Sequence, residues 1–104
     1  MERCDLQSAR TKAVDLLSSL EEDAGVPLSF FDGEYGVPES EDHEDVWIFN
    51  WNSVQYILSG SIFDQILMGP IAVPKDGSDP FLLGTARSVS EELQRWRNLR
   101  ARGH

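Results

Sequence analysis

The stretch VWIFNW, residues 46–51, decides the fold of this chain. β-Branched and aromatic residues fill it, and these residue types favour strands. Because side chains alternate along a strand, Trp47, Phe49 and Trp51 point to one face, and Val46, Ile48 and Asn50 point to the other. We expect the aromatic face to pack beneath helices, with a partner-binding role as the alternative. Since helices can cover only one face of a small sheet, we expect the second face to be left for a partner.

Further strands are predicted on both sides of this run. Pro74 lacks a backbone N–H and should limit ladder pairing, so the strand that it ends is expected to be short or to lie at an edge. A turn then returns the chain as a hairpin. The expected strands are Leu28–Phe31, Ile71–Val73 and Phe81–Leu83, with turns at Asp32-Gly33 and at Lys75–Asp79.

Apolar residues at helical spacing predict a helix at each end of the chain. The first runs from about Asp5, a candidate N-cap, to Asp23, and Gly25 and Pro27 end it. A capping box, Ser88 to Glu91, begins the last helix, whose apolar side carries Val89, Leu93, Trp96 and Leu99. Between them, Ser53 can cap a short helical turn that ends at Gly60.

These elements predict a single α+β domain over residues 1–104. It has an N-terminal helix, a small antiparallel sheet of three to four strands, and a C-terminal helix packed on the sheet. Cys4 is the only cysteine, so no internal disulfide can form. The residues after Met1 lack the basic-then-apolar pattern of a signal peptide, and no apolar run approaches the ~20 residues that span a bilayer. We therefore expect a cytoplasmic protein.

Charge is the most unusual feature of the sequence. The formal net charge is −9, and the stretch from Ala13 to Pro74 contains no Lys or Arg. Its most acidic part, Gly36 to Asp45, has no apolar period and is interpreted as a long loop. Such a surface repels nucleic acid and anionic membranes and attracts basic partners. The alternative is that the acidity serves solubility alone.

The sequence does not favour catalysis, a metal or a cofactor. The only thiol, Cys4, could pair with His43 or His104, but neither histidine stands in a nucleophile motif. The acidic loop lacks the spacing of a calcium-binding loop, and one histidine cannot make a zinc site. No carboxylate pair stands in an apolar setting that would raise a pKa. We therefore expect a protein without enzymatic activity and without a cofactor.

Several short motifs, in order, resemble those of the YrhB-like family, classified as immunity protein 35 of bacterial polymorphic-toxin systems. They are the W-x-F strand with its polar Asn52-Ser53 step, Tyr56 before Gly60, the strand Gly69–Val73, the turn Leu83–Ala86, and Glu91 in the last helix. The resemblance covers about Val46 to Arg97. The chain departs from the family pattern at Leu67-Met68, where a Gly-Asn step is common, at Pro74, where an acidic residue is common, and in its longer acidic loop.

The resemblance implies a protein, monomeric or weakly dimeric, that binds and neutralises a cognate toxin. Together with the charge pattern, it suggests a toxin with a basic surface, and no nucleic acid or membrane as partner. A chaperone-like or stress-related binder of unfolded proteins is the alternative. The residues expected to bind the partner are Asp32, Glu34, Glu39, Glu41, Asp42, Glu44, Asp45 and Trp51.

Overall fold

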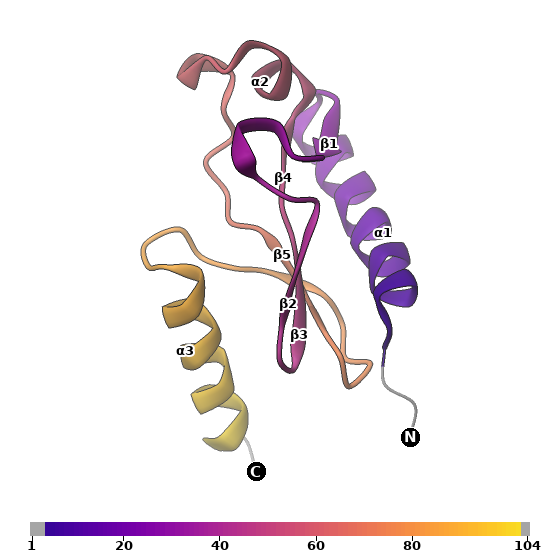
Figure 1. The fold of residues 1–104 in the computed structure, drawn as a ribbon, viewed down its shortest axis with the longest axis vertical. Helices are drawn as coiled ribbons and strands as arrows, with labels where there is room; N and C mark the ends of the chain where they lie inside the picture. The colour runs from indigo at the N-terminus through magenta and orange to yellow at the C-terminus, as the bar shows by residue number, and fades with distance from the viewer. Residues whose placement is uncertain (1–3, 103–104) are drawn as a thin grey trace.

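The computed structural model describes residues 4–102, and Figure 1 shows how its elements are arranged. Two helices flank the strands, and a short helix with a neighbouring 3₁₀ turn lies at one end (Figure 1). The expected α+β class, with a helix at each end of antiparallel strands, is confirmed. In chain order the elements are α1 (Leu6–Ala24), β1 (Leu28–Phe30), the 3₁₀ turn η1 (Glu34–Gly36), β2 (Ser40–His43), β3 (Val46–Phe49), β4 (Trp51–Ser53), α2 (Val54–Ser59), the 3₁₀ turn η2 (Ile62–Asp64), β5 (Ile71–Pro74), β6 (Phe81–Leu82) and α3 (Val89–Arg102).

The strands form two antiparallel sheets. The larger has the order β2-β3-β5-β6, and β1 pairs with β4 in the smaller one. In the larger sheet Ile48 stands opposite Glu41 on one side and Ala72 on the other. The predicted hairpin of β5 and β6 is confirmed, with Ile71 opposite Leu82.

The run at residues 46–51 passes from one sheet to the other at Asn50. The Asn50 N–H donates to the carbonyl of Glu39, next to β2, while its own carbonyl accepts from Phe31, next to β1. Its side-chain amide donates to the Pro38 carbonyl at 3.0 Å and to a Glu41 carboxylate oxygen at 2.8 Å. A polar residue is suited to this position because the chain changes partners here and its polar groups find hydrogen-bond partners on both sides.

Helices cover both faces of the large sheet, so the expectation of a face left open for a partner was wrong. The predicted alternation is confirmed: Phe49 and Val73 lie in a core with Ala9, Ala13 and Leu17 of α1. The opposite face buries a second core that α3 covers, formed by Val46, Ile48, Ala72, Leu83 and Leu93. Each face is only a few residues wide, so one helix is enough to cover it.

The predicted helix caps are confirmed. Asp5 accepts from the Ser8 N–H at 2.8 Å, and Gly25 ends α1 with a φ of +70°. Ser53 caps α2 through the Tyr56 N–H, and Ser88 accepts from the Glu91 N–H before α3. Local geometry within three or four residues determines these contacts, so sequence patterns find them.

One prediction about strands was wrong, and another was met through one of its two alternatives. Residues 40–43 were expected to be loop but form the edge strand β2. The backbone groups along the outer edge of β3 need hydrogen-bond partners, and the backbone of β2 supplies them although its side chains are polar. The strand β5 was expected to be short or to lie at an edge; it is short, with four residues, and it lies between β3 and β6. The Lys75 N–H donates to the Asp45 carbonyl, on the side of β5 that pairs with β3. Because backbone groups alternate along a strand, the nitrogen of Pro74 points to the opposite side, toward β6. There the pairing of β5 with β6 extends only as far as Ala72. Its missing N–H therefore breaks no pair in the ladder.

Candidate protein-binding surface

The acidic residues expected to bind a partner lie in two separate places. Asp32 and Glu34 lie in the turn after β1, where the neighbouring Tyr35 contacts α2 through its hydroxyl, which donates to the Ile57 carbonyl at 2.9 Å. The remaining five lie along the hairpin of β2 and β3, which extends toward the opposite end of the molecule (Figure 1). These five are Glu39, Glu41, Asp42, Glu44 and Asp45.

Bases from distant segments approach the acidic hairpin. Arg10 of α1 contacts Glu39 at 2.8 Å, Lys75 contacts Asp42, and Arg97 of α3 contacts Asp45 at 2.6 Å. All three bases lie outside the base-free stretch of the sequence. The Arg97 guanidinium donates hydrogen bonds to Asp45 and holds the pKa of that carboxyl below its usual range. Ion pairs within the fold therefore offset part of the hairpin's negative charge.

Near α2, no such base pairs with the acidic residues in the described part of the chain. The carboxylate of Glu34 accepts from the backbone N–H of Asp32 at 2.6 Å, which lowers the pKa of Glu34. Within residues 4–102, no ion pair involves Asp32, Glu34 or Asp64. The structure thus divides the acidic stretch into a partly neutralised hairpin and an uncompensated end.

Trp51 does not lie on the surface. It is only 5% exposed, and its indole N–H donates to the Gly69 carbonyl at 3.0 Å. A side chain this buried offers a partner almost no contact area, and its place in the α1 core explains its aromatic character.

Five exposed apolar side chains of the described chain belong to α2, to η2 and to the segment that follows η2. Figure 1 shows α2 at one end of the molecule, with the chain returning from there toward β5. Phe63 is 94% exposed, Leu58 81%, Leu67 80% and Ile62 75%, and Met68 is also exposed. We call these five residues the apolar tip. Leu58 lies in the predicted short helical turn, but the other four were not predicted as a surface because residues 61–68 fit neither strand nor helix periodicity. The only signal in the sequence was that residues 61–68 are rich in apolar side chains but follow no regular period.

Three consecutive side chains of β4 hold the segment that carries much of this tip. Trp51 bonds Gly69 as described, Asn52 bonds both backbone groups of Ile66, and the Ser53 hydroxyl donates to the Asp64 carbonyl at 2.7 Å. Asn52 and Ser53 are buried. The polar Asn52-Ser53 step therefore serves to position residues 64–69, which have no regular secondary structure beyond the end of η2.

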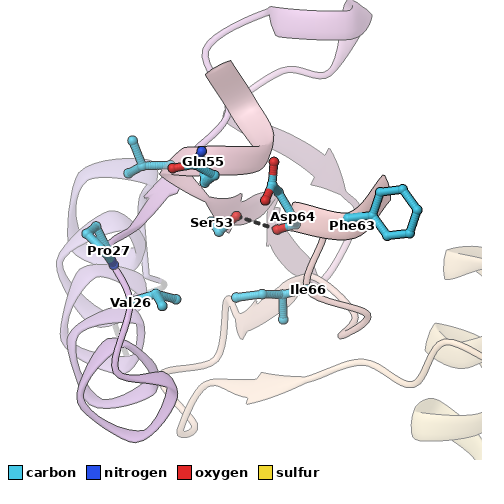
Figure 2. A pocket seen from close by; sticks show the side chains of 8 residues that line it. Val26, Pro27, Ser53, Gln55, Phe63, Asp64 and Ile66 are labelled. Atoms are coloured by element: carbon cyan, nitrogen blue, oxygen red, sulfur yellow. Dashed lines mark hydrogen bonds between the residues drawn. The ribbon is translucent and has the colours of Figure 1, made fainter. Parts of the chain in front are cut away.

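A hollow of about 360 Å³ lies between the start of α2, η2 and the link that follows α1. Figure 2 shows Ser53 bonded to Asp64 beside it, and the Phe63 ring pointing away from it into open space. Apolar and polar side chains both line the hollow. They are Val26, Pro27, Ser53, Val54, Gln55, Phe63, Asp64 and Ile66.

The described residues hold no arrangement suited to a metal ion. Within residues 4–102, no group of three His, Cys, Asp or Glu side chains could hold one. His43 lies 3.3 Å from a Glu41 carboxylate oxygen, and no hydrogen bond in this part of the chain joins it to Cys4. Met1 and His104 lie outside the described residues. No helix between residues 4 and 102 has the length and apolar character to cross a bilayer.

The family model for immunity protein 35 matches residues 7–99, which include α1 and most of α3. The chain belongs to the immunity protein 35 family. The match extends the resemblance seen in the motifs, which reached only from Val46 to Arg97. No curated protein and no solved structure matches the chain significantly.

Family membership bears directly on the expected lack of enzymatic activity. Immunity proteins are typically inhibitors that act by binding, without catalysis of their own, so membership of this family supports that expectation. It also implies a cognate toxin as the partner.

Proposed function

We propose that this protein binds a cognate toxin inside the producing cell and neutralises it, with an acidic surface that steers the encounter. Family membership supports the toxin as partner. The observation that carries the choice of surface is the position of Asp32, Glu34 and Asp64 at an end of the molecule built from the base-free part of the chain. Opposite charges at such a surface accelerate association, with rate constants up to about 10⁸–10⁹ M⁻¹s⁻¹ at low salt.

The acidic hairpin is a second candidate contact region. Glu39, Glu41, Asp42, Glu44 and Asp45 would meet a basic toxin surface only by sharing or replacing contacts that several of them make within the fold. The uncompensated carboxylates near α2 have no ion pair to give up. We therefore rank Asp32 and Glu34 above the hairpin, and we leave the buried Trp51 out of the proposed surface.

A matched pair of charge reversals tests this proposal. Asp32 and Asp79 are both exposed residues outside the helices and strands, and neither carboxylate accepts a hydrogen bond from another described residue. The probe is the purified toxin domain encoded in the reading frame beside this gene. Asp32→Lys should slow association several-fold at low salt and less at high salt, whereas Asp79→Lys should leave the rate nearly unchanged.

Protection of cells supplies the second measurement. Wild-type protein co-expressed with the toxin domain should restore growth. A wild-type protein that neither binds the toxin domain nor protects cells from it would refute the proposed function. Equal association rates for the two lysine variants would instead refute the acidic steering surface alone.

One observation favours a chaperone-like function as a second candidate. Exposed apolar surface is what a protein that holds unfolded clients requires, and the apolar tip supplies it. Such a protein would suppress aggregation of unrelated clients, such as heat-denatured citrate synthase and reduced insulin, at any salt concentration. Failure to suppress either aggregation, together with tight toxin binding, would exclude this candidate.

A further inference from the structure

We propose that the apolar tip is the centre of the toxin interface, and that its occupant is a folded toxin surface with an apolar recess edged by Lys or Arg. This inference rests on the proposed function and adds the part of the surface that supplies affinity. Its first support is exposure: the tip places Phe63, Ile62, Leu58 and Leu67 in solvent, each at least 75% exposed. Concentrations of exposed apolar side chains on soluble proteins mark interaction sites.

The second support is that the tip is held in place from several sides. The backbone between its residues is held by hydrogen bonds from Asn52 to Ile66 and from Ser53 to Asp64. The Asp64 carboxylate accepts from the Ser59 hydroxyl at 2.8 Å, which joins η2 to the end of α2. A surface that is ordered before binding loses less conformational entropy when it binds. This arrangement suits a partner of fixed shape better than a series of unfolded chains.

Aromatic packing holds α2 as well. The ring of Tyr35 lies 5.8 Å from that of Tyr56, and Tyr56 also packs edge-on against Phe31 at 6.4 Å. The Tyr35 hydroxyl approaches the position that a Cβ would take on Gly60, to 3.0 Å. The turn that carries Asp32 and Glu34 is thus fastened to the helix that carries Leu58. The acidic residues and the apolar residues belong to one continuous end of the molecule.

Charge identifies the occupant. Interfaces between proteins have an apolar centre and a polar rim, and here Asp32, Glu34 and Asp64 supply rim charges of one sign. Two copies meeting through this end would bring these carboxylates together, which disfavours a homodimer. A partner with Lys or Arg around an apolar recess satisfies both parts of the surface. The hollow beside Phe63 can in turn receive a side chain of that partner.

Replacement of tip residues tests the inference directly. Phe63→Ser and Leu67→Ser should each weaken binding of the purified toxin domain from the adjacent reading frame, measured by calorimetry. An apolar residue central to an interface typically changes the dissociation constant by about 30-fold or more when truncated. Leu99→Ser is the matched control, because Leu99 is 57% exposed on α3, away from the tip. It should change the constant less than twofold.

Folding does not confound these variants, because both side chains are mostly in solvent; unchanged circular dichroism and melting temperature would verify this. A second measurement needs no variant. Hydrogen exchange of the wild-type protein should slow at backbone amides of residues 58–68 when the toxin domain binds. Unchanged exchange at these amides would overturn the inference.

The outcomes separate the inference from the function on which it rests. If the wild-type protein binds the toxin domain and the Phe63 and Leu67 variants bind equally well, the tip is not the interface and the proposed function stands. If the wild-type protein does not bind it, the proposed function fails. Sedimentation that shows a wild-type dimer disrupted by Phe63→Ser would assign the tip to a second copy. Loss of client protection in the variants, without toxin binding, would assign it to unfolded chains.

Discussion

The side-chain amide of Asn52 hydrogen-bonds both backbone groups of Ile66. Its oxygen accepts from the Ile66 N–H at 2.8 Å, and its nitrogen donates to the Ile66 carbonyl at 3.1 Å. One side chain thus does what a neighbouring strand would do for a segment that has no strand beside it. The same oxygen accepts from the Ser53 N–H at 2.8 Å, so the amide also fixes the start of α2.

Asn52→Ala should lower the free energy of unfolding by about 1–3 kcal/mol, because it leaves the partly buried backbone groups of Ile66 and the buried N–H of Ser53 without their partner. Urea denaturation measures the change. Asn98→Ala on the exposed side of α3 is the control and should stay within about 0.5 kcal/mol of wild type. An unfolding free energy for Asn52→Ala equal to that of the control would show that the amide does not hold the segment.

Gly69→Ala should be among the most harmful single changes in the chain. A Cβ at this position would lie 2.0 Å from the backbone carbonyl oxygen of Leu83, and backbone atoms cannot rotate away. We expect a loss of about 3 kcal/mol or more. The Gly-Pro and Leu-Gly motifs of the sequence therefore meet in space at this close approach.

Gly84→Ala is the informative comparison for Gly69. Its Cβ would lie 2.5 Å from a Glu92 carboxylate oxygen, at the end of a side chain that can move. The loss should be about 1 kcal/mol, including the hydrogen bond from the Gly84 N–H to Glu92. Thermal and chemical denaturation of both variants would check the order, and a larger loss at Gly84 would contradict it.

Leu93→Ala should loosen α3 from the sheet. Leu93 is the only buried residue of that helix between Val89 and Arg102, and it is 1% exposed. Truncation of a buried leucine costs about 2–5 kcal/mol. Hydrogen exchange should rise throughout α3, while Leu99→Ala, at a mostly exposed position, should leave both stability and exchange near wild type. Slow exchange in α3 of the Leu93 variant would mean that other contacts anchor the helix.

Acid should weaken the link between Asp45 and Arg97. The hydrogen bond from Arg97 lowers the pKa of Asp45 in the folded state, so the pair stabilises the fold above the unfolded pKa of about 4. This contribution is lost as the pH falls through the lower, folded pKa. Because both side chains are partly exposed, it amounts to about 1 kcal/mol or less.

The comparison of wild type with Asp45→Asn isolates this effect. The wild-type advantage in unfolding free energy should be largest near pH 6 and should shrink steadily below pH 4. Asp32→Asn, whose carboxylate has no ion pair among the described residues, should show no such trend. A constant difference between wild type and Asp45→Asn from pH 6 to pH 3 would exclude the ion pair as its cause.

Much of the fold could be predicted because local rules govern it. Asp5, Ser53 and Ser88 cap helices through hydrogen bonds within three residues, and alternation assigned Phe49 and Ile48 to opposite cores. The edge strand β2 escaped prediction because its side chains are polar. Its pairing depends on the backbone of β3, which no pattern within residues 40–43 reveals.

The candidate surface was predictable only in part. The sequence located Asp32 in a turn, but it could not reveal that Tyr35 fastens the chain beside that turn to α2. It could not show that Phe63 lies in solvent while Trp51 is buried, because both are aromatic residues in apolar runs. Exposure is a property of packing, and packing depends on residues far away in the chain.

The sequence by itself determined the class of fold, the helix caps, the two faces of the central strand and the lack of any base between Ala13 and Pro74. Only the tertiary structure decided which carboxylates are balanced: Arg10 lies 29 residues from Glu39, and Arg97 lies 52 residues from Asp45. It also decided that α2 and η2 display apolar side chains at an acidic end. Local preferences act within a few residues, whereas charge pairing and exposure depend on segments that only the folded chain brings together.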